Sequence, residues 1–321
     1  MRIGLLTHNR GAASFRVRWE RYLPLLEERG HSVAVAEIPA GRRGRRAVLD
    51  RGSDADLVVL QRRLLMARDF KRLRRRARRL VYDFDDALCY RPHPPHRSWA
   101  RARRFFRTVA RSDAVIAGSR ILAGVARLRR PHVHVVPSSV DVERYAPAQK
   151  LAAPTAVWVG QRATLPYLEP VLQAVERSGF KLRVIADVFP PGAEQVAWAK
   201  DTAPAHLAEC HVGLMPLSDD RFARGKCGYK LLQYYAAGLP AVVSPVGAGR
   251  VLADGGALVA REPDHWEAAL RRLADPELRA ELGARGRSFV VRRYASDRVG
   301  ARLARVLEAI AAPPPGCGAS G

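Results

Sequence analysis

Lys226 and Lys230 are the residues whose type and spacing most directly suggest chemistry. Lysine is rare in this chain, since only 6 of its 55 basic residues are lysines, yet these two lie four positions apart. Residues four apart share one face of a helix, so we expect both ammonium groups on one face of its first turns. A glycine-flanked helix N-terminus with two cations attracts a diphosphate. The structural alternative is an ordinary helix packed on a sheet, with both lysine chains reaching solvent along its surface.

The surrounding segment, residues 212–247, predicts the elements that position these lysines. A strand is followed by a loop with two aspartates and two arginines. Gly225 and Gly228 bracket the start of a helix that runs to about Ala237, and Gly238 ends it before the next strand. The glycines therefore place both lysines at the N-terminal end of the helix.

Three aspartates form a second candidate site, because Asp83, Asp85 and Asp86 crowd the carboxyl end of a predicted strand (LVYDFDDALCY, 80–90). Such carboxylates can bind a metal, act as a base or accept hydrogen bonds from hydroxyls. An acidic cluster alone is weak evidence for Mg²⁺, which needs octahedral oxygen ligands and usually substrate phosphates. The structural alternative is loop capping together with salt bridges to the neighbouring arginine-rich segment.

Short β-branched runs alternate with helical patterns along the whole chain. Strand candidates in the first half are Ile3–Thr7, Val33–Glu37, Leu57–Leu60, Leu80–Asp83, Ala114–Ala117 and Val133–Val136. Those in the second half are Ala156–Gly160, Leu182–Ala186, Val212–Met215, Ala241–Ser244 and Ala257–Val259. Amphipathic stretches such as Phe15–Arg29 and Ser98–Arg111 separate them, which predicts βαβ units and parallel sheets.

The alternation restarts once, which predicts two tandem Rossmann-like, doubly wound α/β domains facing across a cleft. The boundary falls in a Pro- and Ala-rich connector at 147–154. We therefore expect one domain over 1–150 and a second over 151–296. A last helix is expected over 297–312, followed by a disordered Pro/Gly-rich tail at 313–321.

The formal net charge of +24 is concentrated in the first half. Residues 1–150 hold 34 basic against 14 acidic residues, whereas residues 151–321 hold 21 against 17. Two clusters, residues 42–46 and residues 62–79, should attract an anionic lipid surface or another polyanion. The alternative is a pair of solvated arginine-rich faces. No nucleic-acid-binding motif is visible and no aromatics interleave the clusters, so we expect no nucleic acid partner.

Other classes of function find little support. The four cysteines lie far apart with no C-x-x-C pair, so neither a disulfide framework nor a zinc site is expected. No apolar run is long enough to span a membrane, and residues 1–8 lack the features of a signal peptide. We therefore expect a cytoplasmic protein, peripheral at the inner membrane face if the basic clusters bind lipid.

The 212–247 segment resembles the signature region of the retaining, GT-B-fold glycosyltransferases of family 4, also called group 1. The family pattern K-L-L-E-Y-M-A-x-G-L-P-V-V appears here as KLLQYYAAGLPAV, from Lys230 onward. Three further stretches resemble the same family. They are VHVVPSSVDVERYAP (133–147), AVWVGQRATLPYL (156–168) and the helical segment 262–295.

The resemblance implies a role for several residues. Gly160 and Arg162 would approach the diphosphate, and Lys230, with Lys226 nearby, would neutralise the leaving nucleoside diphosphate. Gln233 takes the position of the family's ribose-binding Glu. Gly11, in the loop after the first strand, would sit where backbone amides face the donor; a plain turn glycine is the alternative.

Two departures from the family pattern affect the donor site. The family has two glutamates spaced eight apart, and here Gly225 and Gln233 stand in their places. A glutamine still hydrogen-bonds hydroxyls, but a glycine replaces no carboxylate. Asp219 or the adjacent Asp220 would then serve from the preceding loop. In relatives the strand end that carries Asp85 and Asp86 faces the sugar and acceptor.

The expected function is glycosyl transfer from a nucleotide-sugar to a hydroxyl on a glycolipid, polysaccharide or other glycoconjugate. The resemblance implies retained configuration, and the cations would make a metal or other cofactor unnecessary. One alternative is a catalytically inactive or isomerising nucleotide-sugar-binding relative on the same fold. The other is a polyanion-binding protein that uses the arginine clusters.

Overall fold

The computed structural model describes residues 1–146 and 148–312, apart from the side chains of residues 52 and 53. The chain forms two compact units. The first contains Met1–Ser138 and the chain from Asp297 onward, and the second contains Ser139–Ser296. Residues 139–146 belong to the second unit because Val140, Val142 and Tyr145 pack in its core. The tail expected to be disordered, 313–321, lies outside the described residues.

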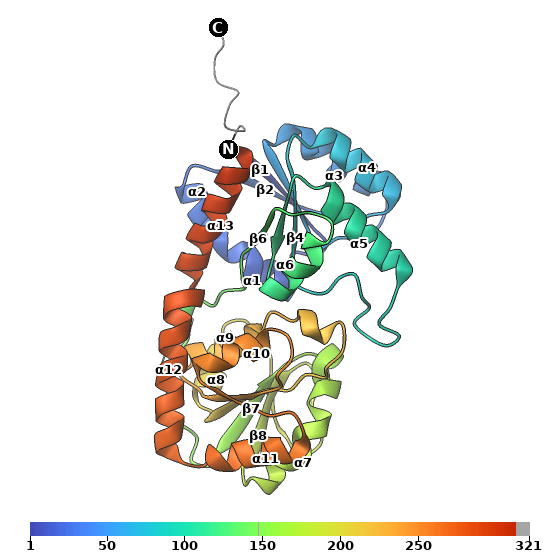
Figure 1. The fold of residues 1–321 in the computed structure, drawn as a ribbon. Coiled ribbons are helices and arrows are strands. Elements are labelled where there is room, and N and C mark those ends of the chain that lie inside the picture. The colour runs from blue at the N-terminus through green and yellow to red at the C-terminus, as the bar shows by residue number, and fades with distance from the viewer. Residues whose placement is uncertain (147, 313–321) are drawn as a thin grey trace. The chain divides into compact units, whose positions relative to one another are not determined.

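The first unit is built on a six-stranded, wholly parallel sheet of order β2-β1-β3-β4-β5-β6 (Figure 1). Its strands are β1 (Arg2–Thr7), β2 (Ser32–Glu37), β3 (Leu57–Gln61), β4 (Leu80–Phe84), β5 (Ala114–Ala117) and β6 (Val133–Val135). Every residue of β3, β4 and β5 is buried. Strands covered on both faces read as continuous apolar runs, which explains why the sequence predicted them.

Helices cover both faces of this sheet (Figure 1). They are α1 (Ala13–Arg18), α2 (Leu23–Glu28), α3 (Arg42–Asp50), α4 (Ala67–Arg76), α5 (Trp99–Arg111), α6 (Arg120–Arg127) and α13 (Ser296–Ala311), with 3-10 turns η1 (Glu20–Tyr22) and η2 (Arg51–Asp54). Helix α13 contributes Val299, Leu303 and Leu307 to the core formed with α1 and α2. The last helix of the chain is therefore an integral part of the first unit.

The second unit has a second six-stranded parallel sheet, of order β12-β11-β10-β7-β8-β9. Its strands are β7 (Thr155–Val159), β8 (Lys181–Ala186), β9 (Glu194–Ala197), β10 (Val212–Met215), β11 (Ala241–Val243) and β12 (Ala257–Val259). Its helices are α7 (Leu172–Arg177), α8 (Ala203–Ala208), α9 (Tyr229–Ala236), α10 (Ala248–Leu252), α11 (Pro263–Arg272) and α12 (Pro276–Tyr294), with 3-10 turns η3 (Val142–Arg144), η4 (Arg162–Tyr167), η5 (Glu169–Val171), η6 (Ala223–Gly225) and η7 (Ala253–Gly255). The predicted α/β class with two Rossmann-like units is confirmed.

The structure refines the expected elements in three places. The stretch Phe15–Arg29 is not one helix, because α1 ends at Arg18 and α2 begins at Leu23 after η1, with Pro24 in its first turn. Within residues 62–79 only α4 is helical. Strand β9, with sequence EQVA, was not predicted because it lies at the sheet edge with little apolar burial.

Candidate functional site

Helix α9 carries Lys230 in its first turn, and a glycine sets where the helix begins. Gly228 stands before Tyr229 with a φ of 72°, a conformation that other residues rarely adopt. A Cβ at Gly228 would also lie 2.6 Å from Leu252 Cδ1. Lys226 therefore precedes the helix in extended backbone, so the prediction of two lysines on one helical face was wrong.

The position of α9 on the sheet is fixed by Tyr234, a fully buried residue. Its ring lies so close to Gly213 of β10 that a Cβ there would be 2.3 Å from the ring. The Tyr234 hydroxyl donates to the carbonyl of Leu214 at 2.9 Å and accepts from the amide of Val159 at 3.2 Å. The N-terminal end of α9 is thereby held beside the carboxyl ends of β7 and β10.

The Lys230 ammonium lies 4.2 Å from the centre of the Trp158 ring. Its hydrogen-bond partner is Thr164 Oγ1, at 3.5 Å. No carboxylate pairs with Lys230 among the residues that the structure describes. Burial, together with the positive charge of Lys226, lowers the pKa of Lys230 to about 7. The two lysines thus influence each other electrostatically although they do not share a helix face.

The loop after β7 forms the opposite wall of this site. Gly160 is required there, because a Cβ would lie 1.7 Å from the Trp158 ring. The backbone amide of Arg162 donates to Asp187 Oδ1 at 2.9 Å, whereas its side chain is exposed. Gln161 and Thr164 close a capping box that fixes the start of η4. The loop therefore presents Thr164 to Lys230 and leaves the Arg162 guanidinium in solvent.

Gln233 lies deeper on α9 and is only 7% exposed. Its Nε2 donates to the Tyr145 hydroxyl at 3.0 Å. Tyr145 comes from the segment 133–147, so two stretches that resemble the same family meet at this hydrogen bond. The amide side chain is therefore held in one orientation by the protein.

The loop before α9 holds the remaining predicted donor-site residues. Asp219 pairs with Arg224 at 2.6 Å at the surface, and that hydrogen bond lowers the pKa of Asp219. Asp220 accepts from the amides of Phe222 and Ala223 at 2.7 and 2.8 Å. Gly225 is buried in η6. Both aspartates thus have partners within the loop itself.

In the first unit, the three aspartates of residues 83–86 pair with two different arginines. Asp83 is completely buried and paired with Arg18. Asp85 and Asp86 both accept from Arg62, the latter at 2.8 Å. Among the residues that the structure describes, no group of three or more His, Cys, Asp or Glu side chains is arranged to hold a metal ion. The three side chains therefore do not act as one acidic cluster.

Gly11 lies in the exposed turn after β1. Its amide donates to Asn9 Oδ1 at 2.7 Å, and its carbonyl accepts from Arg16. The neighbouring His8 follows β1 directly and was not predicted as a site residue. Its only sequence signal is its position at the carboxyl end of a buried strand, where ligands of parallel sheets bind.

Three other residues were missed. Trp158 and Thr164 contact Lys230, and Arg62 holds the two aspartates. Arg62 was counted only as part of a charged run, and Trp158 only as a core residue of a strand. Nothing in their local sequence indicates these tertiary contacts.

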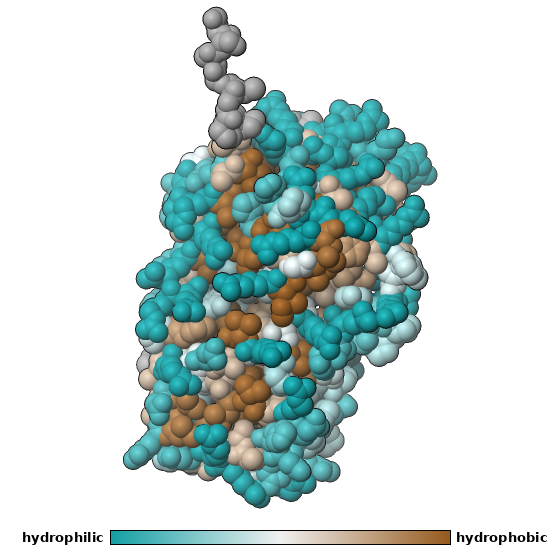
Figure 2. Space-filling model, in the orientation of Figure 1, coloured by the Kyte–Doolittle hydropathy of each residue, from teal (hydrophilic) through white to brown (hydrophobic). Residues whose placement is uncertain are grey.

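The two basic clusters map to α3, α4 and the loop before α4. Arg46 on α3 has its pKa lowered mainly by Arg42 and then by Arg68 of the α4 segment. Figure 2 shows a mostly hydrophilic surface over α3 and α4. No helix in the described part of the chain is both long and apolar enough to cross a membrane.

Comparisons with known proteins agree with this architecture. Residues 149–275 match the family model described as glycosyl transferases group 1. No curated protein sequence matches the chain significantly. Sucrose-phosphate synthase from Thermosynechococcus elongatus is similar in structure, with a TM-score of 0.79, 14% identity and coverage of 96% of this chain and 98% of that one.

Two further solved structures share the fold. HepE from Anabaena, in complex with UDP, has a TM-score of 0.73 and 15% identity, covering 96% of this chain and all of its own. A glycosyltransferase from Rickettsia africae has a TM-score of 0.72 and 9% identity, covering 96% and 98%. Both units thus share the GT-B fold of these structures, and residues 149–275, within the second unit, match the family model of the glycosyl transferases group 1.

Proposed function

We propose that the chain transfers a sugar from a nucleotide-sugar donor to a hydroxyl acceptor, with retained configuration and without a metal ion. The observation that carries the proposal is the half-buried Lys230 side chain, whose ammonium lies against Trp158 and Thr164 with no carboxylate partner among the described residues. A partly desolvated cation without a counter-ion is costly to the fold. A diphosphate would supply the missing negative charge.

The proposed chemistry is electrostatic stabilisation of the leaving group. As the anomeric bond breaks, negative charge grows on the diphosphate, and fixed positive groups lower the energy of that state. Lys230 would face this charge, with Lys226 and the N-terminal end of α9 adding to the field. Arg162 would reach the diphosphate from the loop after β7, near Gly160. Gln233, oriented by Tyr145, would bind a ribose hydroxyl.

UDP is the first donor nucleotide to test, because the structurally similar HepE was solved with UDP and with UDP-glucose. The experiment is a melting and turnover screen against UDP-, GDP-, ADP- and TDP-sugars, with and without EDTA. Stabilisation by one nucleotide family, with slow donor hydrolysis unchanged by EDTA, is the expected result. Nucleotide binding without hydrolysis or transfer would favour the alternative of a catalytically inactive nucleotide-sugar-binding protein. If no nucleotide raises the melting temperature, the assignment of a donor site at Lys230 is contradicted.

The affinity for UDP should fall as the pH rises above 7. With a pKa of about 7 in the empty site, Lys230 is half charged at pH 7. A bound diphosphate favours the charged form, so above pH 7 each binding event takes up a proton. The Kd should then rise by up to about tenfold per pH unit.

Calorimetric titration between pH 7 and 9 measures this slope. The matched variant is Lys230→Arg, whose guanidinium stays charged over that range, so its Kd should be nearly constant. A wild-type affinity that is independent of pH, or an equal slope in both proteins, would contradict the assignment.

The first unit would receive the acceptor, with Gly11 near the donor and Asp85 and Asp86 at acceptor or sugar hydroxyls. Its basic surface over α3 and α4 would bring the enzyme to anionic lipid at the inner membrane face, where each basic residue contributes about 1 kcal/mol. Co-sedimentation should rise with the anionic lipid content of vesicles and fall with added salt. Binding that ignores anionic lipid would contradict this localisation.

A further inference from the structure

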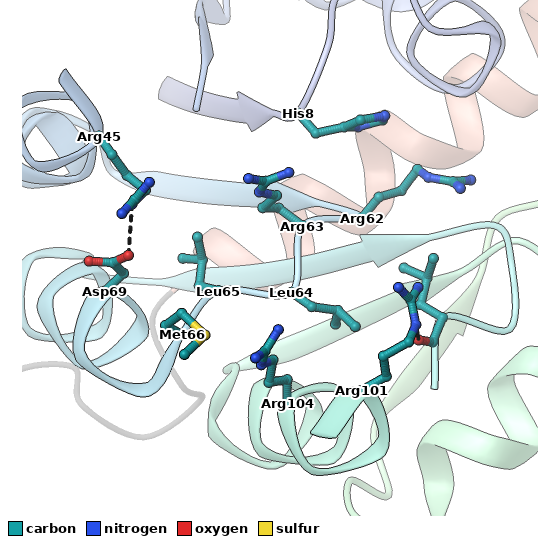
Figure 3. Close-up of a pocket in the computed structure, with 11 residues that line it drawn as sticks. His8, Arg45, Arg62, Arg63, Leu64, Leu65, Met66, Asp69, Arg101 and Arg104 are labelled. Carbon is teal, nitrogen blue, oxygen red and sulfur yellow. Dashed lines mark hydrogen bonds and ion pairs between the residues drawn. The ribbon is translucent and has the colours of Figure 1, made fainter. Parts of the chain in front are cut away.

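The first unit contains a cavity of about 420 Å³ whose lining is strongly cationic. Its walls come from the end of β1, the loop between β3 and α4, helix α3 and helix α5 (Figure 3). The positively charged and titratable residues that line it are His8, Arg45, Arg62, Arg63, Arg101 and Arg104. Asp69 is the carboxylate among the lining residues, so positive charge greatly exceeds negative charge there.

Two of the lining arginines are already neutralised by the protein. Arg45 pairs with Asp69 at 2.8 Å, as Figure 3 shows. Arg62 is shared between Asp85 and Asp86. These two arginines are therefore structural parts of the walls.

The other three arginines have no such partners. The side chains of Arg63 and Arg104 make no ion pair or hydrogen bond among the residues that the structure describes. Arg101 donates through Nε to the carbonyls of Leu88 and Tyr90, at 3.2 and 2.9 Å, but pairs with no carboxylate within the described ranges. Burial lowers the pKa of Arg101. An anion in the cavity would relieve this unfavourable arrangement.

The backbone at Arg62 is held in a conformation that side chains rarely adopt. Its φ is 58°, and the amide of Arg63 donates to the carbonyl of Gln61 at 2.6 Å, which makes a γ-turn of the rarer, strained form. Such strain persists only where surrounding contacts impose it. Arg62 is held on both sides of this turn, because its amide donates to the Asp83 carbonyl at 2.8 Å and its side chain pairs with Asp85 and Asp86. The turn leaves Arg63 as the next residue on the cavity wall.

His8 supplies a polar atom that lacks a partner. Its Nδ1 is buried and has no hydrogen bond. Burial lowers the pKa of His8, with Arg62 and Arg63 adding to the effect. The imidazole is therefore neutral at pH 7 and can donate or accept a hydrogen bond at the same cavity.

The remaining lining is apolar. Leu64, Leu65, Met66 and Leu88 line the cavity beside the arginines, and Met66 is 55% exposed. Figure 3 shows Arg101 and Arg104 reaching from α5 toward the loop that carries Leu64, Leu65 and Met66. The ligand that fits such walls has an anionic group next to an apolar group.

We propose that this cavity binds a phosphate or diphosphate ester joined to an apolar chain, with Arg63, Arg101 and Arg104 on the phosphate oxygens. This assignment rests on the proposed function: the ligand of the cavity is the acceptor. The acceptor is then a lipid-linked phosphate whose sugar or hydroxyl end receives the transferred sugar. Guanidinium groups match phosphate geometry through paired hydrogen bonds, which favours phosphate over a single-point anion.

The test is binding of farnesyl diphosphate to the full chain by calorimetry, with pyrophosphate and farnesol as the separated halves. Farnesyl diphosphate should bind, pyrophosphate should bind more weakly, and farnesol should not bind. The double variant Arg63→Gln/Arg104→Gln should lose about tenfold or more in affinity. Arg103→Gln is the matched control, because Arg103 is exposed on the same helix and does not line the cavity.

A diphosphate could also enter the donor site, so Lys230→Met is included. Loss of farnesyl diphosphate binding in Lys230→Met but not in the double arginine variant would overturn the proposal. An equal loss of farnesyl diphosphate affinity in Arg103→Gln would also overturn the proposal, in favour of a general polyanion surface. So would a short DNA duplex that competes with farnesyl diphosphate as well as pyrophosphate does. UDP binding is measured in every variant, and its persistence in the double variant separates failure of the cavity from failure of the donor site.

Discussion

Lys230→Met should lose catalytic turnover and melt at a higher temperature than the wild type. Turnover should fall by about 10²–10³-fold, because one preorganised cation opposite the leaving diphosphate is removed. The melting temperature should rise because methionine fills a similar volume without placing a charge in a half-buried position. In the empty protein the ammonium lies on the Trp158 ring with Thr164 Oγ1 3.5 Å away, which compensates burial poorly.

Opposite changes in activity and stability distinguish a functional lysine from a structural one. A lysine that holds the fold would lower both when removed, whereas a group held for its ligand destabilises the empty protein. Lys181→Met is the matched control, since Lys181 is exposed on β8 of the same unit. The control should change neither quantity. A lower melting temperature in Lys230→Met, or retained turnover, would refute the donor-site assignment.

The parallel sheets were predictable from the sequence because their central strands are covered on both faces. LVVLQ in β3 and LVYDF in β4 are buried at every position, so burial is visible as a continuous apolar run. Strand β9 shows the limit of this signal. Its sequence EQVA has little apolar burial, and the strand exists because it pairs with β8 at the sheet edge.

The candidate donor site was predictable as a region but not in its geometry. Glycine and lysine patterns located the start of α9, and the structure brings Lys226 and Lys230 into electrostatic contact. That contact does not come from helical spacing, because Gly228 starts the helix after Lys226. The Trp158 ring beneath Lys230 depends on the packing of α9 on the sheet, which local sequence does not encode.

Aspartates 83 to 86 show the same limit in the first unit. Their crowding was visible in the sequence, but the arginine that each one meets lies far away along the chain. Asp83 pairs with Arg18, 65 residues away, and Asp85 pairs with Arg62, 23 residues away. Only the tertiary fold therefore distinguishes Asp83, a buried structural carboxylate, from Asp85 and Asp86, whose partner Arg62 lines the cavity.

Asp83→Asn should destabilise the first unit by about 3–5 kcal/mol, because it leaves the buried Arg18 guanidinium without its counter-ion. The two side chains are 0% and 3% exposed, and Arg18 contacts both carboxylate oxygens, at 2.5 to 3.2 Å. Trp19 Nε1 donates to the same carboxylate at 2.9 Å. The melting temperature should fall by about 10 °C, measured by differential scanning calorimetry.

The matched control is Asp50→Asn, which removes a carboxylate charge from the same unit at its surface. Asp50 accepts from Arg72 at 2.7 and 2.5 Å, but the two side chains are 33% and 40% exposed. Solvent screens such a pair, so Asp50→Asn should lower the melting temperature far less than Asp83→Asn does. The double variant Arg18→Met/Asp83→Leu should recover part of the stability, since it removes both buried charges together. Equal melting temperatures of Asp83→Asn and Asp50→Asn would mean that the Arg18 charge reaches water. Asp83 would then be a candidate catalytic residue again.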